Sequence, residues 1–479
     1  LDSERYKVAL LADGFPLSAF LPTLGASDFS GSLTAEGLKF DPTSPRALTD
    51  LKAQVDSLRF AGIDLNNLKL AANIAQQQLD ARFSAYNTAI EGEGTVQGNF
   101  INGYHLNLDA IMEHCSLQQL AGAKADVGLG SMINIDFDSD EAFEAFQTKG
   151  SLCYNHFDTP ERSVMMKDIF FDFASSPDTT TSHLNAGNMT LAFATKGHIS
   201  TLGTQITPMM DYLSTCSERL RISHDTLRTL LPGLNLTLHA GNDNPMTNIL
   251  RAMGYTLDTV SVNLATYPEI GLTGDFMMKN FHYGTFQLDN ATATLSHNDY
   301  GIKLSGQVIN NARRNPNKFA LAFRSYLLAN TGGLDFQFKD EHGNTGFDVG
   351  VRADVTHEGL KAQLYPQHPK IAFRSFEVNR DNFVFLGNNK QLQADLRLRA
   401  DDGTGLQLLS ESTDSLNDIT LNIQSLNLKE LSEVLPYMPK MGGLFNADLH
   451  VADNHESISA TGTIATKGLE YEGSYLGNI

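Results

Sequence analysis

Apolar and polar residues alternate along most of this chain. In "LKLAANIA", Leu68, Leu70, Ala72 and Ile74 share one parity. The same pattern recurs in "FDVGVRADV" (347–355) and "LQADLRLRA" (392–400). A period of two places apolar side chains on one face of a β-strand. Because the other face is polar, the pattern predicts antiparallel strands with one wet face rather than a parallel α/β sheet.

Turn signals separate these runs and a few helices interrupt them. Gly, Asn and Asp, which supply the positive φ angles of hairpins, gather at 297–301, 340–344, 356–359 and 400–405. Helical spacing of apolar residues predicts helices over 48–58 and 206–220, and a third over 428–436 that Pro436 stops. Short Leu-rich helices between strands are expected also in 115–128 and 224–233, where each would cap an apolar strand surface.

The number of runs exceeds what an ordinary sheet holds. A run and its turn take about 12 residues, whereas open sheets rarely exceed about 10 strands unless they curl or fold over. Two architectures remain open: tandem β-sandwiches, or one long curled antiparallel sheet whose apolar face lines a groove. No sharp boundary is visible, so we expect one elongated β-rich segment over 1–479, with 310–318 as the best candidate for an exposed loop. Because the alternation at 458–464 is followed by a strand just begun at 469–473, and residue 1 is Leu, we expect an internal piece of a longer protein.

Composition narrows the classes of function. The net charge of −20 argues against nucleic acid, which needs clustered Lys and Arg, and disfavours docking on an anionic membrane surface. Three Cys residues lie far apart, without disulfide or zinc spacing. No run of 18 apolar residues and no signal peptide is visible in the sequence.

Candidate chemistry is sparse. Asp136, Asp138 and Asp140 resemble the start of a calcium loop, but Glu141 and Gln147 occupy the positions that need Gly and Glu. A wet strand face ending in an acidic turn is the simpler interpretation. His105 with His114, or His282 with His297, could meet in space, although solvated histidines are the more common case. We therefore predict no catalytic residue, metal or cofactor.

The last quarter of the chain carries a resemblance to a known family. The stretches that carry it are "LNLKELS", "GLFNADLHV" and "GTIATKGLEYEG", with "HPKIAFRSFEVNRDNFVFLGN" (368–388) upstream. They resemble the TamB proteins of the AsmA-like superfamily, the Bacteroidota branch in particular, over about 365–479. Over 1–364 only the general style matches.

The resemblance implies a specific architecture and role. Such proteins form a β-taco, a long curled sheet with an apolar interior and an open seam. They are anchored in the inner membrane by an N-terminal helix, cross the periplasm and partner TamA or a related Omp85-type barrel. They are associated with phospholipid transport between the membranes and with outer-membrane protein insertion.

A lipid groove would be lined by the apolar face of the clearest strands. Burying acyl chains there would gain about 0.8 kcal/mol per CH₂. The candidate lining residues are Phe347, Val349, Val351, Leu392, Leu396, Leu398, Ile419, Leu421, Ile423, Phe445 and Leu449. The same residues could form the closed cores of an adhesive or structural tandem β-sandwich. The absence of Trp disfavours an outer-membrane barrel and a carbohydrate-active enzyme.

Overall fold

The predicted all-β class, with antiparallel strands and a few helices, is confirmed. The computed structural model describes residues 5–16, 28–60, 63–122, 127–411, 417–453 and 457–479. It is 65% strand and 10% helix. The chain divides into two compact units: unit 1 comprises Leu1–Gly203 with Leu234–Gly254, and unit 2 comprises Thr204–Gly233 with Tyr255–Ile479.

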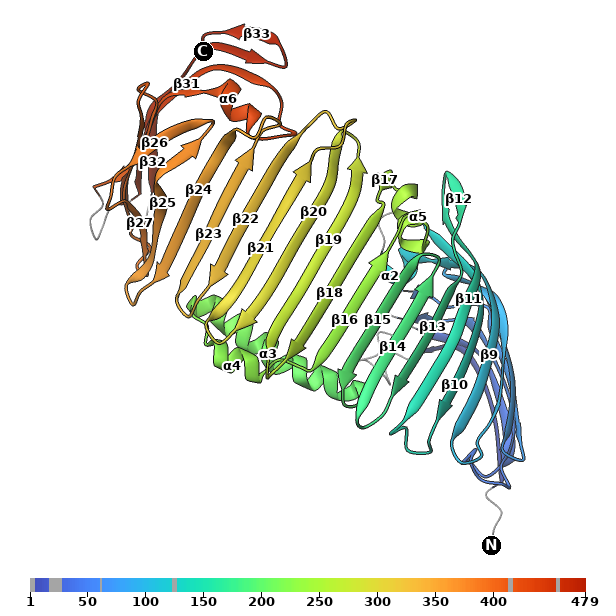
Figure 1. The fold of residues 1–479 in the computed structure, drawn as a ribbon. Coiled ribbons are helices and arrows are strands. Elements are labelled where there is room, and N and C mark those ends of the chain that lie inside the picture. Colours follow the sequence, from blue (N-terminus) through green and yellow to red (C-terminus); the bar gives the residue numbers. More distant parts are fainter. Residues whose placement is uncertain (1–4, 17–27, 61–62, 123–126, 412–416, 454–456) are drawn as a thin grey trace. The chain divides into compact units, whose positions relative to one another are not determined.

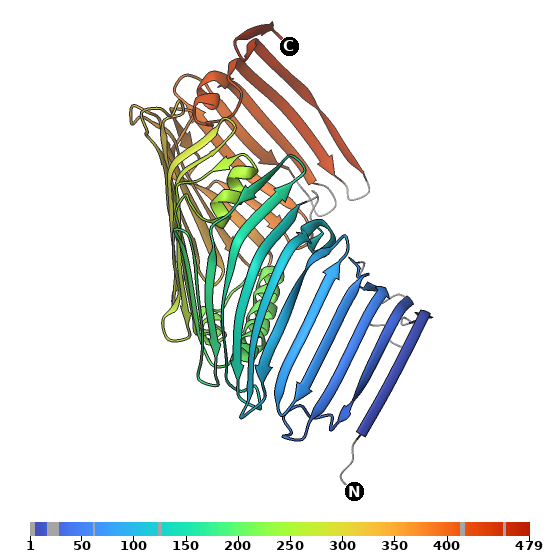
Figure 2. The ribbon, with the colours of Figure 1, turned by 90° about the vertical axis from the view of Figure 1, so that its right-hand side faces the viewer.

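Unit 1 is a meander in which each main strand pairs antiparallel with the next along the chain (Figure 2). The main strands are β1 (Arg5–Pro16), β2 (Asp28–Leu38), β3 (Leu48–Ser57), β6 (Leu68–Ala75), β7 (Gln78–Tyr86), β8 (Ile90–Asn99), β9 (Tyr104–Ser116), β10 (Gly128–Ser139), β11 (Phe146–Thr159), β13 (Ile169–Ser175), β14 (Thr179–Ala186), β15 (Met189–Lys196) and β16 (Leu234–Ala240). A short hairpin adds β12 (Arg162–Met165) to β11, and β4 (Arg59–Phe60) pairs with β5 (Ile63–Asp64).

Unit 2 is built in the same way, from antiparallel strands that pair mostly in chain order (Figure 1). Its strands are β17 (Tyr255–Thr256), β18 (Thr259–Tyr267), β19 (Gly271–Tyr283), β20 (Phe286–Asn298), β21 (Gly301–Asn310), β22 (Phe319–Leu327), β23 (Thr331–Lys339), β24 (Thr345–Val355), β25 (Gly359–Ile371), β26 (Arg374–Val378), β27 (Phe383–Gly387), β28 (Leu392–Ala400), β29 (Gly405–Ser410), β30 (Asn417–Asn427), β31 (Met441–Asp453), β32 (Ile458–Tyr471) and β33 (Ser474–Gly477). Between β25 and β28 the sheet forks, because β26 and β27 each pair with both of them.

Short helices interrupt the strands, mostly where the sequence predicts them. They are α2 (Leu117–Ala121), α3 (Ile199–Arg219), α4 (His224–Thr229), α5 (Pro245–Ala252) and α6 (Leu428–Glu433). α3 confirms the helix expected over 206–220, and α2, α4 and α6 confirm the Leu-rich helices. α5 was not predicted, although its capping box, Asn244 with Thr247, and Pro245 in its first turn are sequence-readable signals.

The helix predicted over 48–58 is wrong, because Leu48–Ser57 forms β3. Leu51 and Val55 fit both periods, since Ala53 between them completes an alternating face. β3 pairs with both β2 and β6 over most of its length. The local sequence is compatible with both a helix and a strand. Pairing with β2 and β6 on either side therefore selects the strand.

The sheet of unit 2 curls. Nine strand pairings separate β20 from β30, which in a flat sheet amounts to about 43 Å. The ten residues that follow Asn427, up to Tyr437, include the six of α6 and reach only about 23 Å. Yet the ring of Tyr437 lies 4.5 Å, centroid to centroid, from that of Phe286 at the start of β20. Only a curled sheet brings these rings together.

Two apolar clusters form where unit 2 curls. Phe319, Phe338 and Val434 are buried together, so the segment after α6 packs on strands β22 and β23. The second cluster joins β26 and β28 through Phe376, Val378, Leu398 and Ala400.

The stretch 311–318 is a loop with mostly exposed residues, as predicted, but two asparagines anchor the stretch within unit 2. Asn310 and Asn315 are buried. The buried carboxylate of Asp289 accepts hydrogen bonds from the amide of Asn315 and the backbone N–H of Ala312.

Candidate functional site

The strand register of unit 1 aligns apolar side chains into a continuous row across the sheet. Each member pairs directly with the next one on the neighbouring strand. From β1 to β16 the row runs Val8, Ala35, Leu51, Ala72, Ala81, Val96, Leu108, Ile135, Gly150, Phe171, Leu184, Leu191 and Leu238. Every member is apolar or glycine, so the alternation within each strand becomes an apolar stripe perpendicular to the strands.

A second apolar row runs parallel to the first, two residues away along each strand. It includes Leu70, Phe83, Gly94, Ala110 and Ile133, each paired with the next. This face is only partly covered: Leu70 is 39% exposed. A half-open apolar face of this extent is unusual for a soluble sheet, which buries one face against a second layer.

Aromatic rings on this face lie against glycines of the neighbouring strand. Phe83 pairs with Gly94, and Phe171 pairs with Gly150. A Cβ atom built at either glycine would lie within 2.7 Å of the ring tip. The rings therefore occupy the space that a side chain would need, and only glycine permits this close approach.

A large hollow lies at strands β2 to β11 of unit 1. A cavity of about 1120 Å³ is bounded mainly by polar-face residues of β2 to β11, including Lys52, Lys69, Arg82 and Asp109. Asp109 accepts a hydrogen bond from Asn134 across the strand pair. The five residues named in the second apolar row are among the lining residues as well, so apolar and polar residues border this hollow together.

Unit 2 has an apolar row of the same kind. Val262, Phe276, Ala293, Gly306, Phe323, Phe336 and Val349 pair in turn from β18 to β24. Phe323 lies over Gly306 as Phe171 lies over Gly150. The row ends at β24, because the register between β24 and β25 shifts between Asp348 and Gly350.

Three predicted lining residues lie together on β24. Phe347, Val349 and Val351 pair with Phe338, Phe336 and Leu334 of β23, respectively. Phe347 packs on the cluster that contains Phe338, whereas Val351 is 39% exposed. The exposed apolar surface on this strand is therefore at the Val351 end.

A second group of predicted residues lies on β28, β30 and β31. Directly paired residues of successive strands form two apolar rows: Leu396, Leu408, Leu421 and Leu449 in one, and Leu398, Leu406 and Ile423 in the other. Ile419 pairs with Val451, Phe445 with Leu426, and Leu392 with Leu386 of β27. All share the apolar face of their strands. Leu398 differs in burial, since it is 3% exposed inside the cluster with Phe376.

Leu364 on β25 connects the two groups. It pairs with Val351 and packs against the cluster that contains Leu398. The predicted residues thus belong to one apolar surface of unit 2, part of which is open and part of which is packed core.

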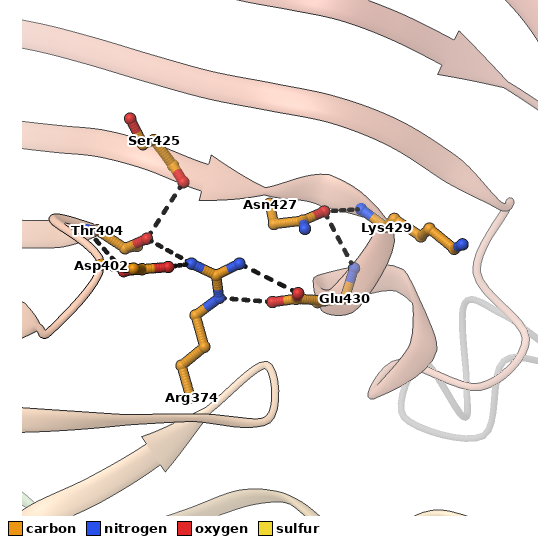
Figure 3. A network of polar contacts seen from close by, with 7 residues as sticks. All are labelled: Arg374, Asp402, Thr404, Ser425, Asn427, Lys429 and Glu430. Atoms are coloured by element: carbon orange, nitrogen blue, oxygen red, sulfur yellow. Dashed lines mark hydrogen bonds and ion pairs between the residues drawn. The ribbon is translucent and has the colours of Figure 1, made fainter.

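A polar clamp holds α6 at the closed part of this surface (Figure 3). The guanidinium of Arg374 donates to both carboxylate oxygens of Glu430, over 2.6 and 3.1 Å, and to the hydroxyl of Thr404 over 2.8 Å; it also pairs with Asp402. Asn427 caps α6 by accepting from the backbone N–H of Lys429 and Glu430. The hydrogen bonds to Glu430 raise the pKa of Arg374.

Sequence reasoning missed the groups that join distant parts of unit 2. These are Arg374 with Glu430, Tyr437 with Asn310, and His224 with His297. Of these residues, only Glu430 belongs to a pattern that can be read from the sequence, since it follows the helix cap Asn427 by three residues. The two members of each pair are too far apart in the chain for a local sequence pattern to connect them. Asp136 and Asp138 lie on β10, as the wet-strand interpretation predicts, and bond to Asn107 and His105.

Two further observations bound the chemistry. Within the described ranges, no group of three or more His, Cys, Asp or Glu side chains is placed to hold a metal ion. Among the same residues, no helix has both the length and the hydropathy needed to cross a bilayer.

Comparison with protein-family models, curated proteins and solved structures gives no match to this chain. The resemblance to TamB proteins therefore has no support beyond the sequence stretches that carry it.

Proposed function

We propose that this chain is a segment of a bridge-like lipid transfer protein whose apolar sheet face carries phospholipid acyl chains. The observation that supports the proposal most is the unbroken apolar row across thirteen strands of unit 1. The face is partly exposed at Val8 and Leu70, so apolar surface is available to a ligand.

The repetition of the row suits transport better than storage. Each strand offers a similar apolar surface about 4.8 Å from the last, so an acyl chain would find nearly the same free energy at every step. Leaving water gains about 0.8 kcal/mol per CH₂ in each position. A flat free-energy profile of this kind lets a bound chain slide without an energy source at the surface itself.

The wider role rests on the resemblance to TamB proteins. On that basis the segment belongs to an inner-membrane-anchored protein that crosses the periplasm and partners an Omp85-type barrel such as TamA. Phospholipid supply to the outer membrane and assembly of its proteins are then the processes that it supports.

A structural or adhesive role is the second candidate. The burial of Leu398 among Phe376, Val378 and Ala400 favours it, since this part of the apolar face is already packed. In that case the apolar surface stabilises the fold and binds no lipid.

The test is to count phospholipid in the purified protein by organic extraction and mass spectrometry. Leu70→Asp places a charge on the apolar face of β6, and Ala71→Asp places the same charge on the opposite face of the same strand. We expect stoichiometric lipid in the parent and in Ala71→Asp, and at least about fivefold less in a folded Leu70→Asp variant. Val351→Asp with Leu396→Asp tests the corresponding face of unit 2.

Circular dichroism separates loss of lipid from loss of fold. A folded parent without lipid contradicts the conduit and favours the structural role. Equal lipid loss in Leu70→Asp and Ala71→Asp would show that lipid binds without preference for the apolar face.

A further inference from the structure

Two buried histidines meet where α4 packs against the sheet of unit 2. His224 is the first residue of α4 and His297 lies near the end of β20. They are 5% and 2% exposed, and His224 Nδ1 lies 3.2 Å from His297 Nε2. A hydrogen bond between two ring nitrogens needs one donor and one acceptor, so the pair cannot persist when both rings are protonated.

The other two ring nitrogens are buried without a hydrogen-bond partner among the described residues: Nε2 of His224 and Nδ1 of His297. A proton added to either ring would place a charge in a buried site, which is costly unless partners compensate it fully. Burial accordingly lowers the pKa of both histidines, and a charge on His224 or Arg228 lowers that of His297 further. The carbonyl of Leu328 and the charge of Asp225 oppose this effect at His224 without reversing it.

Buried Ile222, Leu227 and Leu231 and several polar contacts also hold the segment from Ile222 to Leu231 in place. Ile222 donates its backbone N–H to the carbonyl of Ala329, in the turn between β22 and β23. Arg228 donates to the carbonyls of Pro268 and Glu269, between β18 and β19, and pairs with Asp299, between β20 and β21.

The charged side chains that act on the histidine pair are Asp225 and Arg228 of α4. Asp299 pairs with Arg228, and the Tyr212 hydroxyl bonds to the backbone of Ser223. A six-residue helix has little stability of its own. Its position therefore depends on its tertiary contacts: the buried apolar side chains, the Arg228 contacts and the two imidazoles.

We propose that residues 222–231 form an acid-released latch on the sheet of unit 2, closed by the neutral His224–His297 pair and opened when these imidazoles are protonated. Opening would uncover the apolar side chains of Leu227 and Leu231.

The direction of the pH dependence follows from linkage. Above about pH 6.5, the ordinary histidine pKa, both rings are neutral whether the latch is closed or open, so the opening equilibrium is constant. Below it the open latch takes up protons that the closed latch excludes. The opening constant then rises by up to about tenfold per pH unit for each histidine.

Native-state hydrogen exchange on the full chain tests the proposal. The backbone amides of 222–231 are compared at pH 7.5 and 5.5, after correction for the intrinsic exchange rate. We expect the opening constant to be at least about tenfold larger at pH 5.5. The amides of 428–434 in the same unit, a stretch without histidine, serve as the internal reference and should not change.

The variant His224→Asn with His297→Gln removes both titrating groups, and we expect it to abolish the pH dependence. His183→Gln, at an exposed position on β14, is the control that should keep it. A parent whose 222–231 amides open equally at both pH values, or a double variant that retains the pH dependence, overturns the proposal.

If the double variant does not fold, histidine ring resonances of the parent decide the question. Both buried rings should titrate below pH 6.5. Titration of either ring at or above that value, while 222–231 stays protected, contradicts the latch.

Discussion

The two units apply the same strand pattern but complete their apolar faces differently. In unit 1 the apolar rows stay partly exposed, and its buried apolar side chains are mostly alanines, such as Ala81, Ala186 and Ala240. In unit 2 the sheet curls, and both buried apolar clusters of the described chain form there. A one-sided apolar sheet needs a second surface to exclude water, and curling lets unit 2 provide that surface from its own later strands.

If unit 2 is the better packed of the two units, the largest loss of stability is expected on truncating Phe338. This ring is 2% exposed and stacks on Phe319 at 5.8 Å. We expect Phe338→Ala to lower the free energy of unfolding by about 3–5 kcal/mol, read from the urea midpoint by circular dichroism. Leu70→Ala in unit 1 should cost less than half as much, because Leu70 is partly in water already. Equal losses would show that the face of unit 1 is covered.

The second-largest loss of stability is expected when the polar clamp on α6 is removed. Arg374→Ala removes a bidentate bond to a carboxylate that is itself partly buried. We expect a loss of about 2 kcal/mol. A double-mutant cycle with Glu430→Ala should show coupling of at least about 1 kcal/mol between the two side chains. Additive losses would mean that the pair does not hold α6 to β26.

The glycine–phenylalanine pairs offer a matched test in both units. Gly150→Ala in unit 1 and Gly306→Ala in unit 2 each drive a methyl group into a paired ring, Phe171 or Phe323. We expect each to cost about 1–2 kcal/mol by overpacking. Adding Phe171→Leu to Gly150→Ala should recover part of the loss. A neutral Gly150→Ala would show that the ring is free to move in unit 1 alone.

The smallest effect concerns Tyr365 on β25. Burial, together with a hydrogen bond to Asp335, raises its pKa to about 12. The neutral phenol thus contributes stability that is complete below about pH 10, the ordinary tyrosine pKa, and is lost as pH rises toward 12. The pKa values of Tyr86, Tyr212 and Tyr437 are raised as well, so ultraviolet titration should show several late-ionising tyrosines. Tyr365→Phe should remove the ionisation step near pH 12. Its persistence in that variant would assign the late step to another tyrosine.

The sequence predicts those features of the fold that are determined within a single strand. Alternation identifies strands such as β6 and β28 because each has one wet face. It fails at β3, where the spacing of Leu51 and Val55 suits a helix equally well and the neighbouring strands decide. The Leu-rich helices were predictable because breakers and caps bound them locally.

Contacts across the curl were beyond such reasoning. Tyr437 bonds to Asn310 over a separation of 127 residues, and His224 meets His297 over 73. Nothing local in "HDTLRT" distinguishes a buried imidazole from a solvated one. Parity alone groups the candidate lining residues on the apolar faces of their strands, but parity could not show that Leu398 is packed while Val351 is open.

The pairing of phenylalanine with glycine affects how evenly side chains protrude from the apolar face. A ring laid over the neighbouring strand levels the surface: it fills the depression at a residue without a side chain and removes the protrusion that an upright ring would make. The height of the face is therefore a property of residue pairs rather than of single residues. Substitutions that keep the surface even must change both partners together. Because the two partners lie on neighbouring strands, the evenness of the face cannot be read from one strand alone.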